Sequence, residues 1–122
     1  MKLHLAQTPG QNRVTGYGAG YVAINGVRHE AHLLVTAERL IPWEIDRFEA
    51  LSAEHFGDVL ALGPEIVILG TGAAQRFPRP EQVRALTAAG VGLEVMDSKA
   101  ACRTYNILMA EGRKVVAAIL IA

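Results

Sequence analysis

At 122 residues, 51% of them hydrophobic and 20% charged, the chain has the size and composition of one soluble globular domain, and we expect residues 1–122 to form it. Twelve basic residues balance twelve acidic ones, so no net charge attracts a polyanion, and we expect no nucleic-acid partner. The chain has one cysteine and no signal-peptide core at its start, so we predict a cytoplasmic protein. It has no apolar run of about 20 residues, so we predict no transmembrane segment.

The first 35 residues have the pattern of strands joined by tight turns. Asn25-Gly26 is the strongest turn signal in the chain, because a type I′ hairpin requires positive φ at both central positions. Residues 21–24 lead into this turn and residues 27–30 lead out of it. We therefore predict a β-hairpin in this region, followed by a buried strand at residues 33–35.

Glycines and histidines in this region suggest two kinds of site. Gly16, Gly18 and Gly20 resemble a phosphate-binding loop, but no helix pattern follows them. We interpret them as a strand that is bulged or closely approached by other backbone. His29 and His32 would point to opposite faces of a strand, because side chains alternate with period two, so we expect no metal site.

The middle of the chain contains an edge signal and the start of a helix. Pro42 cannot donate to a sheet ladder, which places its segment at an edge or in a loop. We interpret Trp43, the only tryptophan, as a core residue. The first helix is expected to begin near Ser52, an N-cap serine between Leu51 and Phe56, which have the spacing of a hydrophobic staple.

The second half alternates strands with helices. Residues 65–72 are a short run that is apolar on both faces and ends in Gly70-Thr71-Gly72, which is typical of a buried strand. The elements expected after it are a helix over residues 80–89, a strand over 91–97, a helix from 98 to about 110 and a strand over 115–121. This β-α-β-α-β order predicts a layered α/β sheet with right-handed crossovers.

The last predicted strand should lie inside the sheet. Residues 115–121 carry no charge and neither face is polar, and such a strand would aggregate if it were an open edge. We therefore place it beside residues 66–69. Glu94 gives the strand over residues 91–97 one polar position, so we place that strand nearer an edge.

Five short motifs follow one another in the second half: Pro64-Glu65, Ile68-Leu69-Gly70-Thr71-Gly72, Val95-Met96-Asp97, Ala101-Cys102-Arg103-Thr104-Tyr105-Asn106 and Glu111-Gly112-Arg113. With Gly16-Tyr17-Gly18 and Pro42-Trp43 earlier in the chain, they resemble the small α/β family that includes mitochondrial complex I assembly factor 3. The resemblance covers nearly the whole chain, and the run from Asn106 to Arg113 is its most specific part.

The resemblance implies a three-layer α/β fold with a mixed central sheet, to which this chain adds the N-terminal hairpin region. For the mitochondrial relatives it implies a non-catalytic role in assembling the respiratory NADH dehydrogenase, and it carries over no catalytic residues. We therefore expect an interaction or assembly factor that has protein partners, needs no cofactor or metal, and is a monomer or a weak homodimer.

The alternative is a binder of nucleotides or small anionic metabolites, or an enzyme, with its site at the C-terminal ends of the strands, where open α/β sheets bind ligands. The candidate residues are Gly70, Thr71, Gly72, Arg76, Asp97, Ser98, Lys99 and Arg103. The Gly-Thr-Gly turn could bring backbone N–H groups to an anion, and Asp97 has the position of an acid that holds a ribose. Gln75 stands where a third glycine would be needed, however, and the helix starts about eight residues late, so close helix packing is the competing interpretation.

Four side chains of the third predicted helix bear on this alternative. Lys99 and Arg103 have the spacing that places them on one face, and with Arg76 and Arg79 they are the best anion-binding candidates; capping and a solvated surface are the other interpretation. Cys102 has no C-x-x-C partner and no histidine near it in sequence, so we predict a buried, unreactive thiol. For Asn106, in mid-helix, we predict a structural hydrogen bond to a neighbouring loop.

Overall fold

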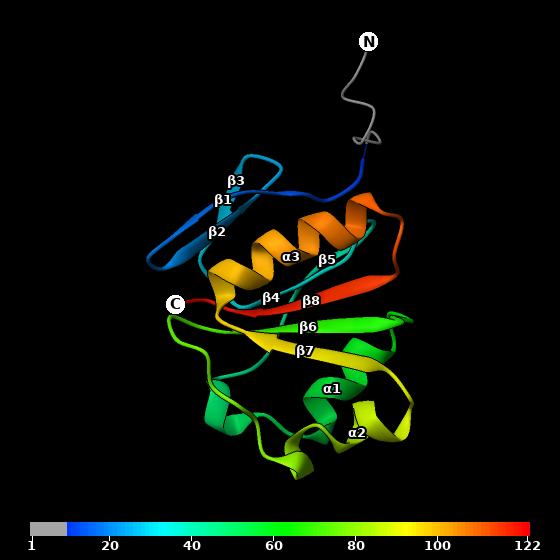
Figure 1. Cartoon of the computed structure of the whole chain (residues 1–122). Helices are drawn as coiled ribbons and strands as arrows, with labels where there is room; N and C mark the ends of the chain where they lie inside the picture. The colour runs from blue at the N-terminus through cyan, green and yellow to red at the C-terminus, as the bar shows by residue number, and fades with distance from the viewer. Residues whose placement is uncertain (1–9) are drawn as a thin grey trace.

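The computed structural model describes residues 10–122, which form two β-sheets and the helices that pack on them (Figure 1). The smaller sheet is antiparallel and consists of β1 (Val14–Gly18), β2 (Tyr21–Ile24) and β3 (Val27–His29). The larger sheet has the order β5-β4-β8-β6-β7, with bounds Leu40–Pro42, Leu33–Val35, Val115–Leu120, Ile66–Thr71 and Gly92–Met96. Strand β4 is antiparallel to both of its neighbours, whereas β6 is parallel to β8 and β7, so the predicted mixed sheet is confirmed.

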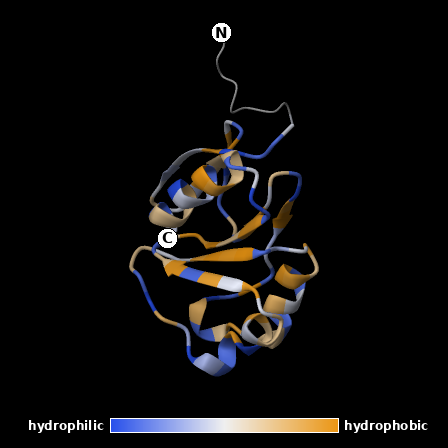
Figure 2. Ribbon diagram, turned by 45° about the vertical axis from the view of Figure 1, so that its right-hand side comes forward, coloured by the Kyte–Doolittle hydropathy of each residue, from blue (hydrophilic) through white to orange (hydrophobic). Residues whose placement is uncertain are grey.

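The helices cover both faces of the five-stranded sheet. Helix α3 (Ser98–Ala110) lies on one face, between the two sheets, and α1 (Ala53–Leu60) and α2 (Arg84–Ala88) lie on the other (Figure 1). Each face has its own hydrophobic core, and the central strands are coloured as hydrophobic for most of their length (Figure 2). The three-layer α/β fold is confirmed, and the small sheet adds an outer layer over α3. No helix within residues 10–122 has the length and hydropathy that a membrane crossing requires.

Strand β8 lies between β4 and β6, as its uncharged sequence predicts. All six of its residues are buried, because side chains that point to one face pack under α3 and those that point to the other pack over α1 and α2. Strand β7 is an edge strand with an exposed Glu94, and β5, which contains Pro42, is the opposite edge. These three sheet positions agree with the sequence analysis.

The predicted hairpin is present between β2 and β3. Asn25 and Gly26 have φ angles of 51° and 83°, the conformation that a type I′ turn requires. Strand β1 has an irregular register next to Gly16, and a Cβ added at Gly18 would lie 2.6 Å from the Tyr21 ring. The alternating glycines therefore permit a bulge and a close ring contact, which confirms the interpretation of a bulged strand.

Asn106 connects α3 to β1 across 92 residues of sequence. Its side-chain oxygen accepts the backbone N–H of Val14 at 2.9 Å, and its amide donates to the carbonyl of Val14 at 2.8 Å. Nearby, the Tyr105 hydroxyl donates to the carbonyl of Asn12 at 2.8 Å. These bonds attach the small sheet to the helix. The predicted structural role of Asn106 is confirmed, but its partner is the first residue of β1 and not a loop.

The N-terminus of α1 has the predicted cap. The Nδ1 atom of His55 accepts the backbone N–H of Ser52 at 3.1 Å, so a histidine occupies the place that glutamate usually has in a capping box. Leu51 and Phe56 are both buried in the same core cluster. Trp43 is buried beside them and donates its indole N–H to the carbonyl of His55 at 3.3 Å.

The helix predicted over residues 80–89 is divided in two. A 3₁₀ turn covers Pro80–Gln82, and α2 begins only at Arg84, because Val83 has φ −110° and ψ 10°. The side chain of Gln82 is buried; its oxygen accepts the backbone N–H of Arg79 at 2.7 Å, and its nitrogen donates to the carbonyl of Leu51 at 3.2 Å. The bond to Arg79 belongs to a capping box at the start of the 3₁₀ turn, and the bond to Leu51 attaches this turn to the segment before α1.

The two histidines near β3 have different surroundings. Strand β3 ends at His29, and His32 lies in the connection to β4. The Nδ1 atom of His32 accepts the backbone N–H of Ile121 at 2.9 Å, which ties the C-terminal residues to this connection. Among residues 10–122, no three His, Cys, Asp or Glu side chains are grouped so that they could hold a metal ion.

The position of β8 can be tested by shortening one of its buried side chains, that of Ile119. Ile119 is fully buried and pairs with Leu33 of β4 and Gly70 of β6. We expect Ile119→Ala to lower the free energy of unfolding by about 2–5 kcal/mol, because the neighbouring strands cannot close the cavity. Urea denaturation measures this change, and a loss below about 1 kcal/mol would mean that the strand is peripheral.

Cys102 is fully buried in α3, which confirms the predicted burial, and burial raises the pKa of its thiol to about 11. The ordinary value is 9.0, so below pH 9 the folded protein should contain roughly 100-fold less thiolate than the unfolded chain. We expect an aromatic disulfide reagent at pH 8 to react at least about 100-fold more slowly with the native protein than with the protein in urea. Equal rates in the two states would show an accessible thiol.

Candidate functional site

The connections that follow the neighbouring strands β6 and β7 lead to opposite faces of the sheet. The chain leaves β6 towards α2 on one face of the sheet and leaves β7 towards α3 on the other. Sites in open α/β sheets usually form at such a reversal. The structure brings Gly70-Thr71-Gly72 together with Asp97 and Ser98 at this point, as the sequence analysis expected of these two segments.

The side chain of Ser98 fills the space between the strand ends. Its hydroxyl accepts the backbone N–H of Gly72 at 2.8 Å and donates to the carbonyl of Leu120 at 2.5 Å. The backbone N–H of Ser98 donates to the carbonyl of Gly72 at 2.9 Å. Ser98 is buried, and the N–H of Gly72, which was a candidate anion donor, is engaged by the protein itself.

Three backbone donors at the N-terminus of α3, those of Ser98, Ala100 and Ala101, also have internal partners. The carboxylate of Asp97 caps the helix and accepts the backbone N–H of Ala100 at 2.9 Å. A Cβ added at Gly70 would lie 2.9 Å from the Ser98 oxygen and 3.1 Å from the Ser98 Cα atom. Gly72 has φ 97°, a left-handed conformation that favours glycine. Gly70 therefore lets α3 approach β6, and Gly72 makes the turn that follows.

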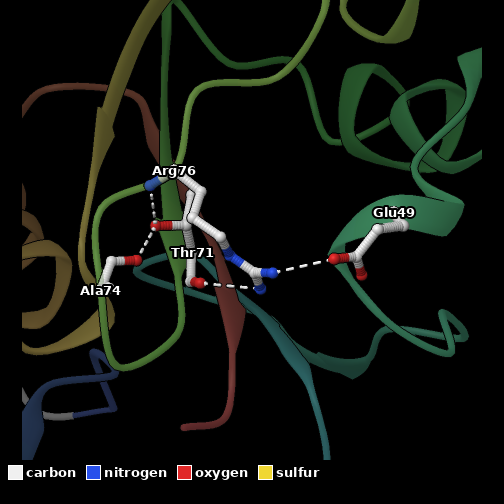
Figure 3. Close-up of polar contacts among 4 residues, drawn as sticks. All are labelled: Glu49, Thr71, Ala74 and Arg76. Atoms are coloured by element: carbon white, nitrogen blue, oxygen red, sulfur yellow. Dashed lines mark hydrogen bonds and ion pairs between the residues drawn. The ribbon is translucent and has the colours of Figure 1, made fainter.

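The loop after Gly72 is held in place by Thr71 and Arg76 (Figure 3). The Thr71 hydroxyl donates to the carbonyl of Ala74 at 2.7 Å and accepts the backbone N–H of Arg76 at 3.0 Å. The Arg76 guanidinium donates to the carbonyl of Thr71 at 3.3 Å and to the Glu49 carboxylate at 3.0 Å. It also lies over the Phe48 ring, with its central carbon 4.4 Å from the ring centroid.

Further bonds fasten both ends of this loop. Gln75 donates its side-chain amide to the carbonyl of Val95 at 2.9 Å, which attaches the loop to β7. At the far end, the buried Gln82 accepts the N–H of Arg79, whose side chain pairs with Glu81 at 3.0 Å. Residues 73–79, which we call the Phe77 loop, therefore have a defined path although they contain no helix or strand.

Phe77 itself is 74% exposed, more than the other two large hydrophobic residues that are exposed in the described part of the chain, Val27 and Ile107. Phe77 was not among the residues predicted to form a site, because one aromatic residue in a loop has no periodic pattern. The signal that could have found it is its setting, Arg76-Phe77-Pro78-Arg79-Pro80, in which two prolines exclude regular structure and leave the aromatic ring with no helix or strand to bury it.

Lys99 and Arg103, the remaining candidates, are exposed on α3. Arg103 donates to the Tyr17 hydroxyl at 2.9 Å, and this hydrogen bond raises the pKa of Arg103. Arg103 is thus joined to the small sheet, whereas Arg76 is joined to the segment before α1. The two guanidinium groups have separate partners on different elements.

A cavity of about 590 Å³ lies at the opposite end of the sheet. It is lined by the turn between β4 and β5, the connection from α1 to β6 and the connection from α3 to β8. Glu65 joins two of these connections, because its carboxylate accepts Arg113 Nε at 2.7 Å and the N–H of Lys114 at 3.2 Å. The bond from Arg113 lowers the pKa of Glu65. Two motifs of the sequence analysis, Pro64-Glu65 and Glu111-Gly112-Arg113, thus meet in a structural contact.

Known proteins resemble the chain over most of its length. An uncharacterised protein of Rhodobacter capsulatus is 39% identical over 109 residues, which cover 88% of this chain and 82% of that protein. The 13 kDa major membrane protein of Francisella tularensis is 31% identical over 106 residues, 85% of this chain and 86% of that protein. NADH dehydrogenase (ubiquinone) 1 alpha subcomplex assembly factor 3 of Bos taurus is 29% identical over 109 residues, and the match spans only 59% of that longer protein.

The fold is also found among solved structures. A crystal structure of a Bordetella parapertussis protein superposes with a TM-score of 0.88 at 43% sequence identity, covering 95% of this chain and 100% of that one. The model of the family described as "Protein of unknown function (DUF498/DUF598)" matches residues 14–120. This range runs from the first residue of β1 to the last residue of β8. The chain belongs to this DUF498/DUF598 family.

Proposed function

We propose that this chain is a non-catalytic protein-binding factor that assists the assembly of a larger complex. The observation that carries the proposal is Phe77, a highly exposed aromatic side chain on a loop that the rest of the protein holds in place. The name of the bovine relative supports a respiratory NADH dehydrogenase as the complex. That relative is longer than this chain, so the identity of the partner is part of the proposal.

The bracing of the Phe77 loop favours binding. An exposed aromatic ring loses apolar contact with water when a partner covers it, and aromatic and arginine side chains are enriched at the energetic centres of interfaces. Ordering a flexible loop during association costs free energy, and a loop that is already ordered avoids much of this cost. Here the loop is ordered by hydrogen bonds from the side chains of Thr71, Gln75 and Arg76.

The positive charges that flank Phe77 in the sequence are balanced by carboxylates. Arg76 pairs with Glu49 and Arg79 pairs with Glu81, so the two positive charges next to Phe77 each have a carboxylate partner. Such exposed pairs add little stability to the fold. Because Arg76 and Arg79 flank Phe77 in the sequence, charged groups lie in the same loop as the exposed ring, and interfaces commonly combine an apolar centre with a polar rim.

The alternative is an anion site at the ends of β6 and β7. It would require the protein to break internal hydrogen bonds, whereas a partner can contact the exposed Phe77 without such a change. A phosphate that used the backbone N–H of Gly72 would have to displace the Ser98 hydroxyl, which also holds the carbonyl of Leu120. Leaving that buried carbonyl without a donor would cost about 1–3 kcal/mol. The geometry therefore favours the protein-binding proposal.

The proposal is tested by replacing Phe77 and measuring which proteins the chain retains. We expect the tagged wild-type chain to co-purify with NADH dehydrogenase subunits from its source cells, and Phe77→Ala to reduce their yield at least about 10-fold. The matched control is Ile107→Ala, which also shortens an exposed hydrophobic residue, 59% exposed, but on α3. It should leave the yield unchanged.

Two results would contradict the proposal. Equal yields from wild type and Phe77→Ala would show that the loop is not the contact. Resonance shifts at Gly72 and Ser98 on adding nucleotide or phosphate at micromolar concentration would favour the small-anion alternative instead.

A further inference from the structure

Strand β7 leaves one row of backbone groups without a neighbouring strand. Within residues 10–122 it is the last strand of its sheet, and β6 is the one strand that pairs with it there. The N–H of Gly92 donates to the carbonyl of Glu65, which fixes the alternation: Gly92, Glu94 and Met96 pair with β6. Leu93 and Val95 therefore direct their N–H and C=O groups away from the sheet.

One of these outward groups already has a substitute partner. The carbonyl of Val95 accepts the side-chain amide of Gln75 at 2.9 Å, so a side chain supplies the donor that a sixth strand would provide. For the N–H and C=O of Leu93 and the N–H of Val95, the structure of residues 10–122 shows no main-chain or side-chain partner. Because Gln75 belongs to the Phe77 loop, this open edge adjoins the proposed contact surface.

The side chains of β7 define what could pair with it. Leu93 and Val95 are half-buried and pack with the core of the α1–α2 face, whereas Glu94 points to the other face and is exposed. Side chains directly opposite each other on paired strands interact, and like charges there are destabilising. Two copies of β7 paired antiparallel about Glu94 would place two carboxylates opposite each other, so the edge disfavours this self-association.

We propose that β7 accepts an extended segment of the partner protein as a sixth strand, and that this segment alternates apolar residues with lysine or arginine. The basic side chain lies opposite Glu94, and the apolar side chains lie over Leu93 and Val95. Main-chain bonds to Leu93 and Val95 supply affinity, and the alternating side chains supply specificity, as in other cases of strand addition. The inference rests on the proposed protein-binding function and specifies the chemistry of the partner.

The experiment uses the full chain and two short synthetic peptides, one in which valine alternates with lysine and one in which valine alternates with glutamate. Amide hydrogen exchange by NMR should show the Leu93 and Val95 amides exchanging freely in the protein alone and becoming protected with the lysine peptide. The Glu94 amide, which pairs with β6, should be protected in both states. We expect at least about 10-fold tighter binding of the lysine peptide than of the glutamate peptide.

Two variants sharpen the test. Val95→Pro removes an outward N–H and no ladder bond, so it should retain protection at Glu94 but bind the lysine peptide at least about 10-fold more weakly. Glu94→Lys should reverse the preference between the peptides. Unchanged exchange at Leu93 and Val95 in wild type, or equal affinity for the two peptides, would overturn the inference without depending on how either variant folds.

The outcome separates this inference from the proposed function. If Phe77→Ala reduces recovery of the natural partner while the Leu93 and Val95 amides stay unprotected with the lysine peptide, the protein-binding function stands and strand addition is wrong. If the lysine peptide protects both amides while Phe77→Ala leaves recovery of the natural partner unchanged, strand addition stands and the role given to the Phe77 loop is wrong.

Discussion

The hydroxyl of Ser98 is the contact on which the arrangement at the strand ends depends. It joins β6, β8 and α3, because it accepts from Gly72 and donates to Leu120 while its own residue begins the helix. The absence of a side chain at Gly70 lets α3 come close enough for these bonds. Burial makes them matter, since a buried polar group without a partner costs more than a hydrogen bond ordinarily contributes.

This contact also bears on where the protein can act. In many α/β proteins the backbone donors at the strand ends and at the following helix hold a ligand. Here the N–H groups of Gly72, Ser98 and Ala100 donate to the Ser98 hydroxyl, the carbonyl of Gly72 and the Asp97 carboxylate, all within the chain. The loop that leaves β6 is instead fixed by Thr71 and Arg76 and presents Phe77 outward, next to the open edge of β7. The proposed protein-binding function rests on this arrangement.

Much of the fold could be predicted from local sequence signals. The uncharged run at residues 115–121 predicts an interior strand, Asn25-Gly26 predicts the hairpin, and Ser52 predicts the start of α1; all three are confirmed. The same reasoning placed Cys102 in the core and gave Asn106 a structural bond. These features depend on periodicity, turn chemistry or capping, which neighbouring residues determine.

The remaining features depend on contacts between distant residues. Nothing near Gln82 in the sequence shows that its side chain will bond to Leu51, and this contact accompanies the break between the 3₁₀ turn and α2. The predicted strand and helix boundaries place Gly72 and Ser98 at the same end of the sheet. They do not show that the serine hydroxyl accepts the glycine N–H.

Urea unfolding of Ser98→Ala tests the central claim most directly. If the hydroxyl is a structural connector, its removal leaves the buried N–H of Gly72 and the carbonyl of Leu120 without partners, and the free energy of unfolding should fall by about 1–3 kcal/mol. Lys99→Ala, one residue along and exposed, should change it by less than about 0.5 kcal/mol. A Ser98→Ala protein as stable as the wild type would contradict the account, because the hydroxyl would then not be needed to hold the strand ends and the helix together.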